Sequence, residues 1–333
     1  MLLLAVGLFV AGCGGSEEPS QGPSPSPSSP SPSRSATPAP VSLSVTPEEL
    51  RGADPCKLIN EDVLAEYGKV EYDRGISYGQ CDIQVNAPDA ESVSVFVDLQ
   101  DGPSDVSAGA PAPTSVLRDG VTVYESEDVD ALSGSNCTRD VVVREQIAAV
   151  GIGVYGDESV TRACRIADNA AGDVSRLLKA GDLPSARHAP DSLANQDACE
   201  LIKEREAARL PDIDPGERHA AFAGQSCSWG GKSIDERHVT VYFQHVDDAL
   251  EGSPLTVGGR PAAMRYSAAT HSGLLGTSLP ACTVNVEYAE GGPTAKGRTE
   301  VVSVGVAGEL PEERLCSLAR ELAPKALSRL PGA

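Results

Sequence analysis

The chain has 333 residues and a formal net charge of −21, with 40% hydrophobic but only 4% aromatic residues. A chain of this length holds one to three domains, and its cores must be filled by valine, alanine, leucine and isoleucine. No nucleic acid partner and no electrostatic binding to anionic lipid are expected, because both need clustered lysine and arginine.

An apolar run at residues 2–10 opens the chain. It is typical of a signal peptide and is shorter than the roughly 20 residues that span a bilayer. The run leads into Val10-Ala11-Gly12-Cys13, which resembles the lipobox of bacterial lipoproteins. The resemblance implies lipidation of Cys13, cleavage before it, and contact with the outer face of the cell membrane through its acyl chains, palmitate among them. The run lacks the usual preceding Lys or Arg, and an ordinary secretory signal with an incidental cysteine is the alternative.

Residues 14–47 are rich in serine and proline and have few large apolar side chains. Such a segment cannot bury a core, so it is predicted to be a disordered tether that holds the folded part away from a membrane. The predicted organisation is a signal peptide and lipobox at 1–13, this linker at 14–47, and two four-cysteine domains at 48–183 and 190–333.

The two domains are predicted from a repeated cysteine pattern. The first set is Cys56, Cys81, Cys137 and Cys164, and the second is Cys199, Cys227, Cys282 and Cys316. The residues around the cysteines align as well, since Asp54-Pro55-Cys56-Lys57-Leu58-Ile59 matches Asp197-Ala198-Cys199-Glu200-Leu201-Ile202. The chain is therefore predicted to be two tandem copies of one domain.

Alternating apolar residues predict strands at 93–97 and 239–243, and valine-rich runs predict strands at 148–155 and 301–306. Apolar residues at helical spacing follow in each copy and carry the fourth cysteine, Cys164 or Cys316. Pro311 suits the first turn of the second helix, and Pro324 is expected to kink it. The predicted fold class is α+β, with two tandem copies of an antiparallel sheet covered by helices on one face.

Even sets of cysteines in an exported chain predict two disulfides in each copy. Four cysteines allow three pairings, which the sequence alone leaves open; we favour first with second and third with fourth, since these bonds would attach the terminal helices to the sheet. Each would close a loop of about 25 to 35 residues, which stabilises by roughly 3 to 4 kcal/mol. Zinc is the alternative, but structural zinc sites use close cysteine pairs, so no metal is predicted.

Two short motifs resemble those of a known family. The chain has Asp54-Pro55-Cys56 followed by Leu58-Ile59, and Cys227-Ser228-Trp229 in the second copy. They resemble the D-P-C-x-L-[LI] start and the later C-x-W of an actinobacterial envelope lipoprotein domain of unknown function. The resemblance implies two tandem copies over residues 50–330, a fold akin to the Mog1/PsbP type, and no catalytic residues or cofactors. The chain departs from it at Cys81-Asp82-Ile83 and at Ala198.

Two glycine motifs resemble functional motifs, but a structural role is predicted for each. Residues 75–79 fit the G-x-S-x-G nucleophile elbow, but a cysteine-bearing strand follows and the second copy lacks the motif, so a glycine-rich loop is predicted. Residues 151–156 fit G-x-G-x-x-G, which is weak evidence by itself, and small residues in a strand packed under a helix are predicted instead.

Three further features are interpreted as structural. His238 and His245 would lie on opposite strand faces, so they are expected to be solvated or at an edge rather than to bind a metal. Residues 212–216 are predicted to be an acidic turn rather than a calcium loop. Trp229 is expected to pack against a disulfide rather than to stack on a sugar.

The sequence favours a lipid-anchored, non-catalytic binding or accessory protein of the bacterial envelope. Its expected partners are the membrane, through lipid on Cys13, and an envelope protein or small ligand at the cleft between the domains. One alternative is a structural spacer lipoprotein. Another is a hydrolase acting on the cell wall, which would need an acid and a base gathered from both copies.

Overall fold

The computed structural model describes residues 43–74, 77–87, 92–100, 114–130, 134–144, 148–156, 159–221, 224–232, 235–272, 276–290 and 298–332. The predictions for Cys13 and for most of the linker at 14–47 lie outside these ranges. By its contacts the chain divides into Met1–Pro38 and Ala39–Ala333, and all of the described residues belong to the second unit. Within the described residues, no helix combines the length and apolar character needed to cross a bilayer.

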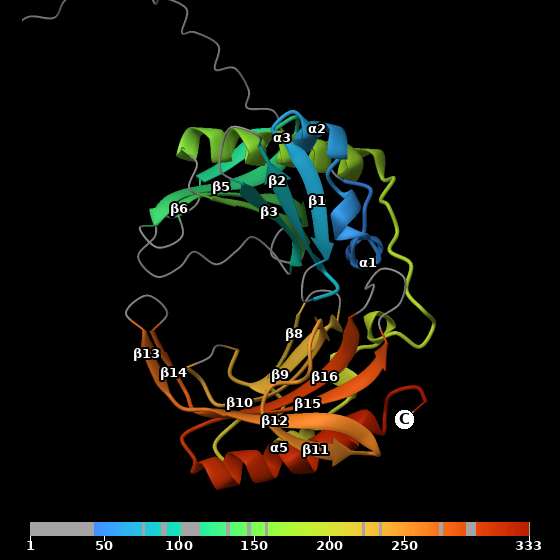
Figure 1. Ribbon diagram of the computed structural model, residues 1–333, viewed down its shortest axis with the longest axis vertical. Helices are drawn as coiled ribbons and strands as arrows, with labels where there is room; N and C mark the ends of the chain where they lie inside the picture. The colour runs from blue at the N-terminus through green and yellow to red at the C-terminus, as the bar shows by residue number, and fades with distance from the viewer. Residues whose placement is uncertain are drawn as a thin grey trace, which may run out of the picture. The chain divides into compact units, whose positions relative to one another are not determined.

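The first half, residues 43–180, is a seven-stranded antiparallel sheet with helices (Figure 1). Its elements are α1 (Pro47–Arg51), η1 (Pro55–Lys57), α2 (Glu61–Ala65), β1 (Lys69–Arg74), β2 (Gln80–Asn86), β3 (Val93–Gln100), β4 (Thr114–Arg118), β5 (Val121–Asp130), β6 (Gly134–Arg144), β7 (Ala148–Gly156) and α3 (Val160–Ala180). The strand order is β1-β2-β3-β7-β6-β5-β4.

The second half, residues 193–332, repeats this arrangement. Its elements are η2 (Leu193–Asn195), η3 (Ala198–Glu200), α4 (Glu204–Ala207), β8 (Arg218–Ala220), β9 (Ser226–Gly230), β10 (His238–Val246), β11 (Ser253–Val257), β12 (Arg260–Ser267), β13 (Thr270–Ser272), β14 (Gly276–Ser278), β15 (Ala281–Glu290), β16 (Thr299–Ala307) and α5 (Glu312–Leu327). The main sheet has the order β8-β9-β10-β16-β15-β12-β11, so each strand occupies the position of its counterpart. The predicted α+β class with two tandem copies is confirmed.

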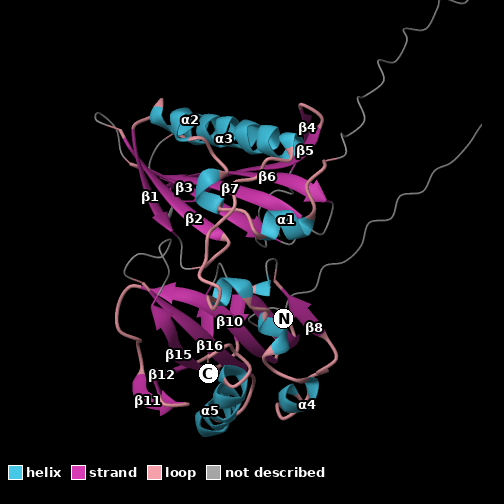
Figure 2. Cartoon of the chain, turned by 90° about the vertical axis from the view of Figure 1, so that its right-hand side faces the viewer, coloured by secondary structure: helices cyan, strands magenta, loops and turns pink. Residues whose placement is uncertain are grey.

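A long C-terminal helix covers one face of each sheet, α3 in the first half and α5 in the second (Figure 2). Helix α3 begins at the Ser159 cap, whose side chain accepts from the Arg162 amide, and ends at Gly181, whose φ of 69° suits a residue without a Cβ. In α5, Pro311 is the N-cap rather than part of the first turn, and the helix continues past Pro324 to Leu327.

The strands bury one face because their side chains alternate. In β10, Val239, Val241 and Phe243 are buried while their neighbours are half-buried. Valines of β16 complete this layer, and α5 adds leucines and alanines above it. The strands predicted at 93–97, 148–155, 239–243 and 301–306 fall within β3, β7, β10 and β16. The helical elements before each sheet are short, being single turns such as η1 and η3.

Four disulfides attach these helical elements to the sheets. The bonded pairs are Cys56–Cys81, Cys137–Cys164, Cys199–Cys227 and Cys282–Cys316, with Cα–Cα distances of 5.0 to 5.1 Å. This is the pairing that the sequence favoured. The acid at the start of the D-P-C motif has a clear role, because the carboxylates of Asp54 and Asp197 accept from the amides of Cys56 and Cys199 and so cap the turns that carry these cysteines.

An ion pair between Glu206 and Arg329 fastens α4 to the segment after α5, with two N–O distances of 2.8 Å. Hydrogen bonding from Arg329 lowers the pKa of the buried Glu206 to about 2. Because the folded pKa lies below the unfolded value near 4.5, the pair's stabilisation is complete above that value and is lost as pH falls toward 2.

We therefore expect Glu206→Gln to remove at most about 3 kcal/mol at pH 7 and to flatten the loss of stability between pH 4.5 and 2. Urea denaturation across this pH window measures both effects. Glu204→Gln, at an exposed position of the same helix, is the control. An unchanged acid slope in Glu206→Gln would show that another group carries it.

Candidate functional site

Tyr78 is the residue that most directly joins the two halves. It lies in the turn between β1 and β2, yet it is only 7% exposed and belongs to the hydrophobic core of the second half. Its ring centroid is 4.2 Å from that of His245 on β10 and 5.8 Å, edge-on, from that of His188. A side chain of the first half is therefore part of the packing of the second.

A buried carboxylate lies beside this ring. Glu300 on β16 is 2% exposed and accepts from the Ser192 hydroxyl at 2.6 Å and the Leu193 amide at 3.0 Å. Burial, and then the Glu300 charge, raise the pKa of Tyr78. Among the described residues no atom meets hydrogen-bond geometry with the Tyr78 hydroxyl. The ring, rather than the hydroxyl, makes the defined contacts.

The segment between the halves, residues 181–192, follows the first half before it enters the second. Asp54 donates its amide to the Pro184 carbonyl at 2.7 Å, and Ala186 donates to the Gly52 carbonyl at 3.0 Å. The two halves also bond to each other directly, because the Gly79 amide donates to the side-chain oxygen of Gln225 at 3.2 Å. The turn that carries Tyr78 thus meets the turn before β9.

A pocket of about 340 Å³ opens where these segments meet. Its lining comprises Arg51, Gly52, Ala53, Tyr78, Ala186, His188, Ala194, Asn195, Gln196, Asp197, Gly224 and Gln225. A guanidinium, an imidazole, three amides and a carboxylate line it together with alanines and one aromatic ring. The volume lies within the range of small-molecule sites. Such a lining can hold a small polar molecule by hydrogen bonds and charge.

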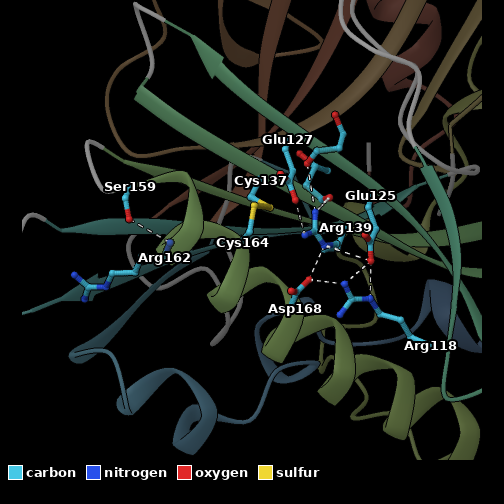
Figure 3. Close-up of a disulfide and its surroundings, with 11 residues drawn as sticks. Arg118, Glu125, Glu127, Cys137, Arg139, Ser159, Arg162, Cys164 and Asp168 are labelled. Carbon is cyan, nitrogen blue, oxygen red and sulfur yellow. Dashed lines mark hydrogen bonds and ion pairs between the residues drawn. A yellow bond between two sulfur atoms is a disulfide. The ribbon is translucent and has the colours of Figure 1, made fainter.

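A second polar cluster surrounds the Cys137–Cys164 disulfide (Figure 3). Arg139 on β6, 2% exposed, donates from Nε to Asp168 of α3 at 2.7 Å and from Nη1 to the Thr138 carbonyl at 2.9 Å. Arg118 also contacts Asp168, at 2.9 Å, and pairs with Glu125. These bonds satisfy a buried cation and join the helix to the sheet, so the cluster is structural.

Two groups of residues that resemble metal-binding sites have other roles. Ligand atoms of Glu127, Cys137 and Cys164 lie within 4.8 Å of one another, but the two sulfurs are bonded to each other in the disulfide. At residues 212–216, the Asp214 carboxylate accepts from the Gly216 amide and Asp212 pairs with Arg237 at 2.7 Å, as expected of an acidic turn.

The histidine prediction is partly wrong. His238 and His245 do lie on opposite faces of β10, but His245 is 7% exposed and lies on a strand paired on both sides. It is neither solvated nor at an edge, because Tyr78 covers it. Trp229 is 1% exposed in the second core, so it presents no face for stacking on a sugar.

Neither glycine motif forms the site that its pattern suggests. Of residues 75–79, only 77–79 are described; they form the turn that bears Tyr78, and strand β2 follows instead of a helix. Residues 151–156 lie within β7. There Gly153 leaves room for the Tyr155 ring, since an added Cβ would stand 2.5 Å from it.

Sequence reasoning missed Tyr78 and Glu300, although the repeat holds a signal for them. The third cysteine of each copy pairs with an equivalent valine, Cys137 with Val154 and Cys282 with Val306. Six residues before these valines stand Ala148 in β7 and Glu300 in β16. A position held by alanine in the first copy is thus held by a carboxylate in the second. That difference marks a place where the copies have diverged.

Fold and site together define a disulfide-cross-linked α+β protein of two repeated domains with a polar pocket at their junction. The chain belongs to the DUF3558 family of proteins of unknown function, whose model matches residues 8–176 and 179–329. None of the curated proteins matches it. A solved structure, the di-domain ARO/CYC StfQ from the steffimycin biosynthetic pathway, is similar over 84% of this chain and 89% of that one, at 11% identity. Its TM-score of 0.19 supports no argument.

Proposed function

We propose that this protein is a lipid-anchored, non-catalytic binding protein of the bacterial cell envelope, attached to the outer face of the membrane through Cys13. Its binding site is the junction pocket, and its ligand is a small polar molecule. The observation that carries the binding role is the pocket itself, lined by both halves and the segment between them. Sites at domain junctions are a common location for small-molecule ligands.

Two features support the envelope location. Four disulfides in one chain suit an oxidising compartment outside the cytoplasm. The apolar run followed by Ala11-Gly12-Cys13 supplies a lipidation signal, and two or more acyl chains anchor a protein stably where one chain is marginal.

The anchor is tested in the full-length chain, expressed in a lipoprotein-processing bacterium and labelled with an alkyne analogue of palmitate. We expect the wild type to be labelled and to sediment with membranes, while Cys13→Ala loses the label and the sedimentation. Ser16→Ala, three residues further on, is the control. Label that persists in Cys13→Ala would contradict anchoring at this residue.

Ligand binding is tested with the same full-length wild-type protein, purified under native conditions. Its mass is measured by native mass spectrometry with and without a small-molecule extract of the envelope. A bound mass is expected on the wild type, weakened in Arg51→Gln and retained in Arg187→Gln. Arg51 lines the pocket, whereas Arg187 is exposed outside it. Absence of any bound mass, or equal loss in both variants, would overturn the ligand role while leaving the anchor result standing.

A further inference from the structure

The contact between the halves is asymmetric, although the halves are repeats. Corresponding strands place Gly224 of the second half at the position of Tyr78 in the first. The turn of the first half therefore carries a large ring, and the equivalent turn of the second half carries none. The part of the second half that receives this ring differs as well, because Glu300 occupies the position of Ala148 in the first half.

The part of the second half that receives the Tyr78 ring is enclosed by three groups of residues. His245 forms one wall, at a ring centroid distance of 4.2 Å, and His188 forms another at 5.8 Å. The start of η2 forms the third wall. Glu300 holds it in place by accepting hydrogen bonds from the Ser192 hydroxyl and the Leu193 amide. All three elements converge on one side chain that is 7% exposed.

We infer that the second half carries a socket for a single aromatic ring, formed by His188, His245 and the Glu300-bound start of η2, and that Tyr78 fills it to lock the halves together. The ligand class of the socket is a phenol or a comparable six-membered aromatic ring. This inference needs neither a lipid on Cys13 nor a molecule in the pocket.

Two other contacts between the halves, both polar, do not replace the ring. Asp73 and Arg298 form an ion pair at 2.7 Å, but the Asp73 side chain is 63% exposed, and pairs of that kind contribute little. The hydrogen bond from Gly79 to Gln225 is a single neutral contact. Removing the ring of Tyr78 therefore removes the main apolar contribution of this turn to the second core.

The test is amide hydrogen exchange on the full chain, with Tyr78→Gly compared with the wild type. Peptides covering residues 188–196 are expected to exchange at least tenfold faster in the variant, because the start of η2 loses its packing partner. Adding 4-methylphenol at millimolar concentration is expected to restore slow exchange in Tyr78→Gly and to leave the wild type unchanged. Tyr78→Phe is expected to exchange as the wild type does, since the ring is retained.

Tyr72→Gly is the matched control, because Tyr72 is 40% exposed on the neighbouring strand β1. It is expected to leave exchange at residues 188–196 unchanged. The inference is overturned if Tyr78→Gly exchanges like Tyr72→Gly, or if Tyr78→Phe exchanges like Tyr78→Gly. Loss of Trp229 fluorescence burial in Tyr78→Gly would signal global unfolding, and the comparison of Tyr78→Phe with the wild type then decides.

Discussion

Replacing Arg139 by alanine is expected to lower the free energy of unfolding by about 3 kcal/mol, the lower end of the range for breaking a buried ion pair. Arg139 is 2% exposed and holds Asp168 of α3 against the sheet. Removal of the cation leaves Asp168 and Glu125 facing each other with Arg118 as their shared partner. It also leaves a void between α3 and β6. Urea denaturation of the folded, oxidised chain measures the loss.

Arg165→Ala is the control for Arg139→Ala. Arg165 lies on the exposed side of α3, so its loss is expected to change the free energy of unfolding by less than about 0.5 kcal/mol. The second half manages without this network, since its strand and helix place Val284 and Arg320 at the positions of Arg139 and Asp168. A loss below about 1 kcal/mol in Arg139→Ala would mean that the first half does not depend on the network either.

Removing the neighbouring disulfide is expected to destabilise the chain by about 2 to 5 kcal/mol. The double substitution Cys137→Ala and Cys164→Ala opens a loop whose ends are 27 residues apart and releases α3 from β6. Both residues are buried, so the lost sulfurs also leave unfilled space in the first core. Thermal unfolding of wild type and double variant, each under oxidising conditions, gives the difference.

A redox control separates the bond from the packing. Reductant is expected to destabilise the wild type further than the double variant, because the wild type has one more disulfide to lose. If the double variant and the wild type unfolded at the same temperature under oxidising conditions, the bond would add nothing to the stability of the first half.

Several elements could be predicted from local patterns alone. Alternation along residues 93–97 and 239–243 predicted β3 and β10, and helical spacing around Cys164 and Cys316 predicted α3 and α5. Repeat alignment predicted two copies, and the placement of the cysteines on helix and strand favoured the pairing that is found. These signals succeed because strand and helix periods, and the loops closed by disulfides, are properties of neighbouring or nearby residues.

The site was harder to predict, since its members come from distant parts of the chain. Tyr78 sits in a glycine-rich turn, where a lone tyrosine predicts nothing in particular. Its burial depends on β10 and β16, which begin 160 or more residues further along the chain. The error over His245 has the same origin, because an alternating pattern assigns a strand face but not what covers that face. Arg139, a cation in a run of β-prone residues, likewise gave no sign of its burial against α3.

By itself, then, the amino-acid sequence determined the repeat, the sheet-and-helix class, the cysteine frame and the lipobox-like start. It could do so because periodicity, capping and cysteine spacing act over short distances along the chain. Only the tertiary structure decided that Tyr78 packs in the other half, that Glu300 binds the start of η2, and that a polar pocket lies beside them. Those features arise where separate strand registers meet, and the identity of each residue does not reveal which distant residue it will face.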